Sequence, residues 1–127
     1  MQQQNAVVIS TRKKEIVTQY LAELDKHIDN LKAGTAEKVL EIREFAGILH
    51  IHPVHLSNTV KEVTGRSTCD HFEEKLLNLS KELLVTTSMP VAQIARQLLY
   101  DPSNFSKFFR HFTGITPKKY RDMKAAL

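Results

Sequence analysis

Two short segments of the chain carry asparagine, serine, lysine and histidine side chains at the spacing of one helix face. One segment is PVHLSNTVKEVTG, from Pro53 to Gly65, and the other is PSNFSKFFRHFTG, from Pro102 to Gly114. Asparagine forms paired hydrogen bonds with adenine, lysine donates to O6 and N7 of guanine, and an exposed valine can contact the methyl group of thymine. The chemistry that these residue types indicate is recognition of base edges in duplex DNA.

Base contacts are predicted on the exposed face near the start of each helix, because a recognition helix presents those residues to the major groove. The predicted base contacts are Val54, Ser57, Asn58, Ser103, Asn104 and Lys107. His55 lies on the same face of the first segment without an assigned contact. A competing interpretation is that Ser103 and Asn104 only support the N-terminal cap of their helix.

Basic and hydroxyl side chains near helix ends are predicted to contact phosphates. These residues are Lys61, Arg66, Thr68, Arg110, Thr116, Lys118 and Lys119. The net charge of the chain is +4, and the positive charge gathers near one end, where six basic residues after position 102 face one acidic residue. Such an asymmetry is typical of a local surface for a polyanion. A solvated surface charge is the alternative for each of these residues.

The elements that must position these side chains are helices, and about seven are expected. The apolar spacing predicts helices over residues 11–32, 40–49, 53–64, 67–85, 91–98 and 102–113, with a short one after Thr116. Asp101 and Thr116 are predicted N-caps, each followed by a proline, and Gly114 is expected just beyond its helix. One face of the sixth helix is predicted to be buried, and its residues are Phe105, Phe108, Phe109 and Phe112.

The chain contains one pattern twice. Residues of about 40–65 and about 90–114 each read as a short helix, a three-residue turn, a helix that begins with proline, and a glycine. This pattern predicts two helix-turn-helix units, joined by a linker helix over about 67–86. The two recognition helices, about 53–64 and 102–113, could then enter major grooves about one DNA turn, or roughly 34 Å, apart. We expect residues 1–34 to form an N-terminal helical segment and 35–127 a tandem helix-turn-helix domain.

These two stretches resemble the DNA-binding domain of AraC/XylS-type bacterial transcription regulators. The resemblance is carried by LEIREFAGILHIHPVHLSNTVKEVTG, residues 40–65, and by IARQLLYDPSNFSKFFRHFTGITPKKYR, residues 94–121. It implies an all-α domain of seven helices in a cytoplasmic transcription regulator, an activator, which binds promoter DNA and contacts RNA polymerase. The sequence departs from the family in the second turn, where Leu99 and Tyr100 stand in place of the usual Gly-Phe.

An interaction module is the second class of function that the sequence leaves open. The first helix carries a heptad-like apolar stripe made of Val17, Leu21, Leu24, Ile28 and Leu31. A helical adaptor, or a homodimer through residues 17–31, would use this stripe.

Enzymatic, metal and membrane functions find little support in the sequence. There is no catalytic pair of carboxylates, no nucleophile with a neighbouring base and no glycine-rich phosphate loop, so we expect no enzyme and no cofactor. Three histidines, His50, His52 and His55, lack the cysteine or acid that would complete a zinc site, since Cys69 is the single cysteine. No apolar run is long enough to cross a membrane, and a cytoplasmic location is expected.

Overall fold

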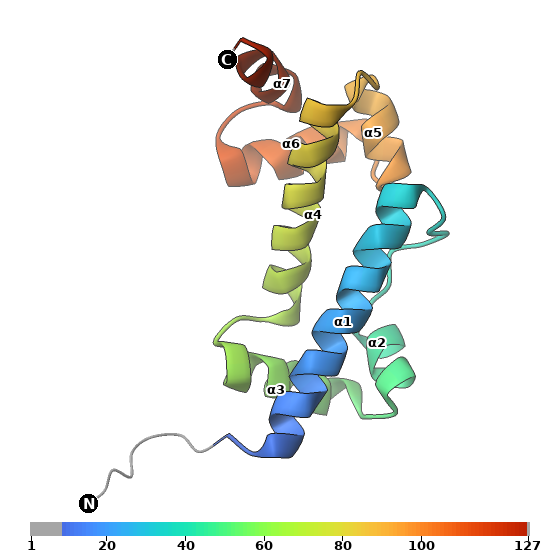
Figure 1. Cartoon of the computed structure of the whole chain (residues 1–127), viewed down its shortest axis with the longest axis vertical. Helices are drawn as coiled ribbons and strands as arrows, with labels where there is room; N and C mark the ends of the chain where they lie inside the picture. Colours follow the sequence, from blue (N-terminus) through green and yellow to red (C-terminus); the bar gives the residue numbers. More distant parts are fainter. Residues whose placement is uncertain (1–8, 127) are drawn as a thin grey trace, which may run out of the picture. The chain divides into compact units, whose positions relative to one another are not determined.

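The computed structural model describes residues 9–126, which are helical over most of their length (Figure 1). The helices are α1 Thr11–Ala33, α2 Ile42–Leu49, α3 Pro53–Thr64, α4 Thr68–Thr86, α5 Val91–Gln97, α6 Pro102–Thr113 and α7 Pro117–Ala125. No strand occurs within residues 9–126. The predicted all-α class with seven helices is therefore confirmed, and the observed helix ends lie within about two residues of the expected ones.

The described chain divides into two compact units. Unit 1 contains residues 9–25 and 40–71, and unit 2 contains residues 26–39 and 72–126. Each unit holds one pair of helices joined by a short turn, α2 with α3 in unit 1 and α5 with α6 in unit 2. The long helices α1 and α4 contribute residues to both units.

The core of unit 1 forms where the first half of α1 meets α2 and α3. Leu56 and Val60 of α3 are completely buried. The ring of Tyr20 from α1 packs edge-on against Phe45 of α2, with 5.3 Å between the ring centroids. Its hydroxyl donates a hydrogen bond of 3.4 Å to the carbonyl oxygen of Thr68, and burial raises the pKa of Tyr20 to about 12. Tyr20 thus ties α1 to α2 and to the start of α4.

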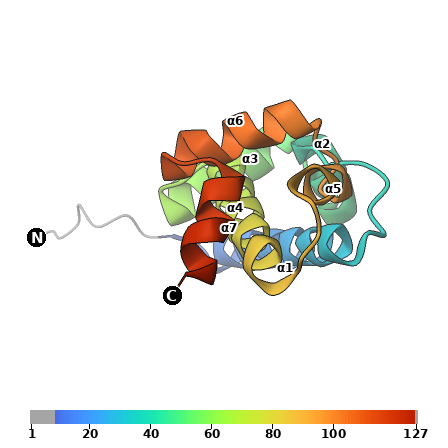
Figure 2. The same cartoon turned by 90° about the horizontal axis from the view of Figure 1, so that it is seen from above.

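The core of unit 2 consists of Leu31 near the end of α1, leucines from α4, and aromatic or aliphatic residues from α5 and α6. Its fully buried members are Leu31, Leu76, Ile94, Ala95, Leu98, Phe105 and Phe109. Two side chains fasten helix ends: Gln97 Nε2 donates to the carbonyl oxygen of Lys32 at 2.6 Å, and Arg121 Nε donates to that of Leu84 at 2.9 Å. The Arg121 bond holds α7 beside the last turn of α4, as both views of the chain show (Figure 1, Figure 2).

The buried face of α6 is shorter than the spacing of its phenylalanines predicts. Phe105 and Phe109 are completely buried, but Phe108 is half-buried and Phe112 is 45% exposed, so the prediction for Phe112 is wrong. Phe112 lies in the last turn of α6, where it contacts the rings of Phe108 and His111 and lines a pocket.

The apolar stripe of α1 is largely used within the chain itself. Val17, Leu24 and Leu31 are at most 6% exposed, and Leu21 and Ile28 are half-buried. His27 belongs to the same buried side and is only 3% exposed, with its ring stacked against Phe72 at 6.3 Å between centroids. Desolvation by burial lowers the pKa of His27 below its ordinary value.

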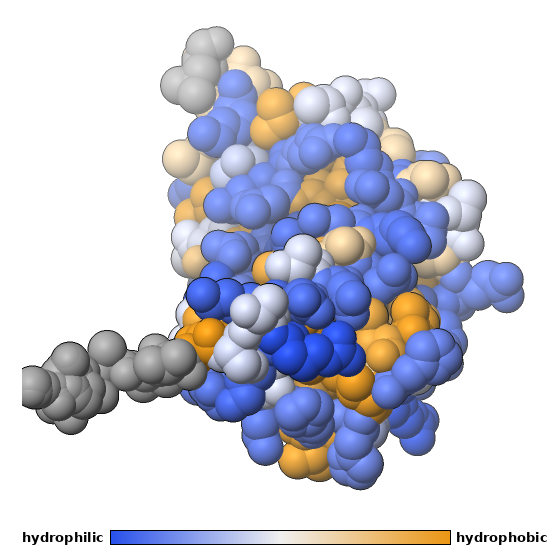
Figure 3. Space-filling view, turned by 60° about the horizontal axis from the view of Figure 1, so that its bottom comes forward, coloured by the Kyte–Doolittle hydropathy of each residue, from blue (hydrophilic) through white to orange (hydrophobic). Residues whose placement is uncertain are grey.

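The face of the molecule drawn in Figure 3 is largely polar. Hydrophilic side chains cover much of the face drawn at the front of Figure 3, with apolar residues between them in separate patches. Within residues 9–126, no helix combines the length and the apolar content that crossing a membrane requires.

Candidate nucleic-acid interface

The turn of unit 1 places α3 by means of an unusual backbone conformation at His50. This residue has φ +57°, in the left-handed region, and its N–H donates to the carbonyl oxygen of Gly47 at 3.2 Å. The next N–H, that of Ile51, reaches back to Ala46 at 3.0 Å. His52 then caps α3, because its Nδ1 accepts the N–H of Val54 at 3.2 Å.

The turn of unit 2 has the same construction 49 positions later. Leu99 has φ +66° and donates to Arg96 at 2.9 Å, and the N–H of Tyr100 reaches back to Ala95 at 2.8 Å. Asp101 takes the place of His52 as the N-cap of α6. Helices α3 and α6 therefore begin with matched geometry.

The exposed face of α3 carries the side chains that the sequence selected in unit 1. Val54 is 60% exposed, Asn58 is exposed and Ser57 is half-buried. Leu56 and Val60 on the opposite side hold this face outward by packing into the core.

The start of α6 combines the predicted contacts with the helix cap. One carboxylate oxygen of Asp101 accepts the N–H of Ser103 at 3.1 Å, its hydroxyl at 2.6 Å, and the N–H of Asn104 at 3.4 Å. The Ser103 hydroxyl, followed by the Asn104 N–H, keeps the pKa of Asp101 below its ordinary value. Ser103 therefore does support the cap, as the competing interpretation held. The carboxamide of Asn104 takes no part in this cap, and Asn104 and Lys107 are both exposed.

The candidate phosphate contacts lie in both units. In unit 1, Lys61 is exposed at the end of α3, Thr68 is half-buried at the start of α4, and Arg66 donates to the backbone of Asp70 at 3.4 Å. The remaining candidates lie in unit 2 and are Arg110, Thr116, Lys118 and Lys119.

The start of α7 brings three of these candidates together. Thr116 is its N-cap, as predicted, and its Oγ1 accepts the N–H of Lys119 at 3.2 Å. Lys118 forms an exposed ion pair of 3.1 Å with Asp122, which is weak enough to exchange for another anion. The side chains of Lys119 and Arg110 are exposed.

Negative charge is nearly absent from the two recognition helices. Glu62 is their single acidic residue, and both of its carboxylate oxygens lie within 3.0 Å of Lys13 Nζ. The helix α6 contains no acidic residue at all. Because an unpaired carboxylate would repel phosphate, this composition suits contact with a polyanion.

The repeat places two further side chains at positions equivalent to predicted contacts. His55, which is exposed, corresponds to Asn104, and Ser106, which is half-buried, corresponds to Ser57. Neither was assigned a contact from the sequence, although the 49-residue offset between the units was visible there and would have selected both.

No group of three or more histidine, cysteine or acidic side chains in residues 9–126 is arranged to hold a metal ion. His52, the central histidine of the cluster near α3, uses its Nδ1 to cap the helix.

A comparison of sequences identifies relatives of the chain. A family model described as "Helix-turn-helix domain" matches residues 45–123. The MmsAB operon regulatory protein of Pseudomonas aeruginosa is 29% identical over 98 residues, which are 74% of this chain and 32% of that protein. The arabinose operon regulatory protein of Escherichia coli is 30% identical over 87 residues, 68% of this chain and 30% of that protein. The chain thus spans about a third of the length of these curated relatives.

Solved structures with the same fold include DNA-binding domains. The C-terminal domain of AraT, a response regulator from Geobacillus stearothermophilus, has a TM-score of 0.74 and 28% identity, covering 85% of this chain and 84% of that domain. The DNA-binding domain of AdpA, solved in complex with a target DNA, has a TM-score of 0.71 over 85% of this chain and 95% of that one. Its identity of 19% makes this a likeness of fold.

Proposed function

Because the chain belongs to the AraC-type family of helix-turn-helix transcription regulators, we propose that it binds promoter DNA sequence-specifically, with α3 and α6 inserted into successive major grooves. The strongest support for this proposal comes from the similar construction of the two helices. The helices α3 and α6 start from matched turns and present exposed polar faces without an unpaired acid. A pair of such helices is what recognition of two short base sequences requires.

Specific roles follow for the side chains on these faces. Asn58 and Asn104 would pair with adenine, Lys107 would donate to guanine, and Val54 would contact a thymine methyl group. The Ser103 hydroxyl donates its proton to Asp101, so it would serve DNA as an acceptor, for example from an exocyclic amino group. Ser57 completes the set of base contacts.

Phosphate contacts would fix the register of the domain on DNA. Their proposed sources are Lys61, Arg66, Thr68, Arg110, Thr116, Lys118 and Lys119. Five of these side chains are cationic, which predicts a plot of log affinity against log salt with a slope of about −4.5 if all five bind. Residues 35–127 would form the DNA-binding domain, with residues 1–34 as the segment that precedes it.

The protein would activate transcription, and its protein partner would be RNA polymerase. The curated relatives named above are operon regulatory proteins, which supports a role at promoters. A homodimer or adaptor contact through residues 17–31 has weaker support, because Val17, Leu24 and Leu31 are buried in the chain itself.

The experiment that tests DNA recognition is selection of duplexes from a randomised pool, followed by anisotropy titrations over a salt series. We expect two short enriched blocks whose centres are about one helical turn apart. Affinity for the selected duplex should exceed that for a scrambled one by about a thousandfold or more, and should fall steeply with salt.

The outcomes separate the two units. A single enriched block would mean that only one recognition helix reads bases. Absence of any enrichment, together with equal affinity for selected and scrambled duplexes, would contradict sequence-specific binding. The variant Lys14→Ala is the matched control, because Lys14 is an exposed lysine of α1 with no proposed contact.

A further inference from the structure

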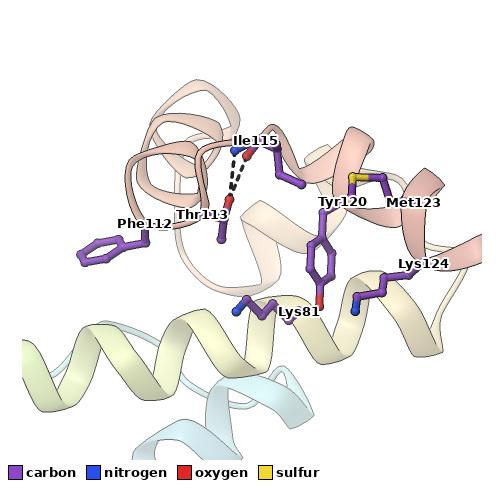
Figure 4. Close-up of a pocket in the computed structure, with 7 residues that line it drawn as sticks. All are labelled: Lys81, Phe112, Thr113, Ile115, Tyr120, Met123 and Lys124. Atoms are coloured by element: carbon purple, nitrogen blue, oxygen red, sulfur yellow. Dashed lines mark hydrogen bonds between the residues drawn. The ribbon is translucent and has the colours of Figure 1, made fainter.

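A pocket opens in unit 2 between the end of α6, helix α7 and the C-terminal half of α4. Its volume is about 360 Å³, within the usual range of roughly 300–1,000 Å³ for small-molecule sites. Its apolar lining comes from Phe112, Ile115 and Met123. Figure 4 places Phe112 at one end of the pocket, with its ring directed away from Tyr120, Met123 and Lys124 at the other end.

Two large apolar side chains of this pocket face solvent. Phe112 is 45% exposed and Met123 is 52% exposed. At the position equivalent to Phe112 in unit 1 stands Val63, which is smaller and half-buried. Exposed apolar groups that gather at a concave site are typical of a place where another apolar group binds.

The walls of the pocket are held by neighbouring aromatic rings. The ring of Phe112 packs edge-on against Phe108 at 5.3 Å and against His111 at 4.8 Å. The ring of Tyr120 packs edge-on against Phe109, which is completely buried, at 5.4 Å. Contacts of this kind fix the rings before a ligand arrives, which lowers the entropic cost of binding.

The polar groups of the pocket are cationic or hydroxyl. Lys81 and Lys124 line it together with Tyr120, whose hydroxyl lies between the two lysine side chains in Figure 4. No ion pair within residues 9–126 joins either ammonium group to a carboxylate, and Lys124 Nζ lies 5.5 Å from the Tyr120 ring centroid. The Thr113 hydroxyl is used by its own backbone, 2.8 Å from the carbonyl oxygen of Phe109.

From these groups we infer that the pocket binds a small aromatic carboxylate. The ring of the ligand would lie against Phe112, Ile115 and Met123, and its carboxylate would accept hydrogen bonds from Lys81, Lys124 and the Tyr120 hydroxyl. Such charge-assisted bonds are stronger in a partly apolar site than in water. A neutral ligand of the same shape would leave both ammonium groups without an anionic partner.

The pocket lies away from Ser103 but borders the start of α7, where Thr116, Lys118 and Lys119 are proposed phosphate contacts. Phe112 follows Ser103 by nine residues, which at about 100° per residue places it on the opposite side of α6. A ligand beside Phe112 would therefore leave the face of Ser103 open. The shared helix allows coupling between ligand and DNA, and any such coupling must be reciprocal.

Calorimetric titration of the full chain with sodium 2-naphthoate tests the inference, with 2-naphthamide as a neutral probe of the same shape. We expect saturable binding of one 2-naphthoate per chain, about tenfold or more tighter than binding of the amide. The double variant Lys81→Gln/Lys124→Gln should lose this difference. The matched control Lys14→Gln/Lys38→Gln removes the same charge from exposed lysines outside the pocket and should keep it.

Three results would overturn the inference: no saturable binding, equal affinity for acid and amide, or the same loss in the control variant. Amide chemical shifts of the unmodified chain give a second readout that does not depend on the folding of a variant. On addition of 2-naphthoate, shifts should change mainly in residues 112–116 and 120–124. Changes centred on α3 or on the DNA-binding face of α6 would equally contradict the assigned pocket.

Discussion

Thr64 and Thr113, which are 49 positions apart, end their helices with the same hydrogen bonds. The Oγ1 atom of Thr64 lies 2.8 Å from the carbonyl oxygen four residues earlier and 3.1 Å from the one two residues later. For Thr113 the same two distances are 2.8 Å and 3.0 Å. Each hydroxyl also accepts the N–H two residues later, at 3.2 Å and 3.3 Å. The chain thus repeats its packing down to single side-chain bonds.

Removing these hydroxyls should destabilise the protein unequally. Thr113→Val keeps the shape of the side chain and should lower the free energy of unfolding by about 1 kcal/mol. Thr64→Val should cost more, about 2 kcal/mol, because its hydroxyl also lies 2.8 Å from Nε2 of His71. Urea denaturation followed by circular dichroism measures both values. Equal losses, or a larger loss for Thr113→Val, would show that the His71 contact contributes nothing.

Glycine at the two turns should stabilise the protein. Leu99 and His50 have φ of +66° and +57°, a conformation that costs a residue with a Cβ about 1–2 kcal/mol. Part of the gain is offset by the greater freedom of glycine in the unfolded chain, so Leu99→Gly and His50→Gly should each add about 0.5–1 kcal/mol. Thermal unfolding provides the measurement.

Two substitutions to alanine serve as controls for this argument. Gly47 lies inside α2 and Gly65 follows α3 with φ +77°, and an added Cβ would meet no atom within 4 Å at either position. Gly47→Ala should therefore stabilise by about 0.5–1 kcal/mol, while Gly65→Ala should destabilise by a similar amount. Effects of the same sign at both positions would refute backbone conformation as the cause.

Equivalent side chains in the two units should each affect one half of the DNA site. Asn58 and Lys107 occupy matching positions on α3 and α6. We expect Asn58→Ala to relax base preference in one enriched block and Lys107→Ala in the other, each by about 1–3 kcal/mol of discrimination. Selection with each variant from the same randomised pool tests this. Loss of preference in both blocks from a single substitution would argue against separate reading by the two helices.

A phosphate contact has a different signature from a base contact. Lys119→Ala should weaken binding to selected and scrambled duplexes alike and make the salt slope shallower by about one unit. Lys14→Ala removes the same charge from an exposed site on α1 and should leave the slope as it is. If the two variants behave identically, Lys119 contributes only to the general charge of the protein.

Stability should decrease in mildly acidic solution because of His27. Its pKa in the folded protein lies below the ordinary value of 6.5, so the unfolded chain binds the proton more readily. The free energy of unfolding should therefore be unaffected by this residue above pH 6.5 and should fall as the pH drops below that value. His27→Leu should remove this part of the decrease, as measured by urea denaturation from about pH 8 to about pH 5. An unchanged pH dependence would exclude His27 as its source.

The caps and the helices could be predicted from the sequence, because they depend on residues that are close together along the chain. Asp101 and Thr116 cap their helices as their side-chain types indicated, and Gly114 follows α6 in the left-handed conformation. The left-handed residues His50 and Leu99 carried no such signal. There the paired backbone hydrogen bonds of the turn outweigh the preference of the side chain.

Burial was harder to predict, because it depends on partners that are distant in sequence. Phe112 has the spacing of a buried residue, but its neighbours in space leave a pocket beneath it. For the candidate site, the base contacts selected from the sequence are exposed except Ser57, which is half-buried, and their contact with DNA stays a prediction. The sequence could not show that the Ser103 hydroxyl is occupied by Asp101, since that depends on the geometry of the cap.

The 49-residue repeat keeps the position of the caps and helix ends in both units, but the side chains on the exposed faces differ. His52 and Asp101 both cap, and Gly65 and Gly114 both terminate, yet Val54 matches Ser103 and Asn58 matches Lys107. If α3 and α6 read DNA as proposed, we expect the two halves of the site to differ in sequence, so that the site as a whole is not palindromic. A single chain would then bind the promoter in one defined orientation. That orientation would set the direction in which a transcribing enzyme is placed.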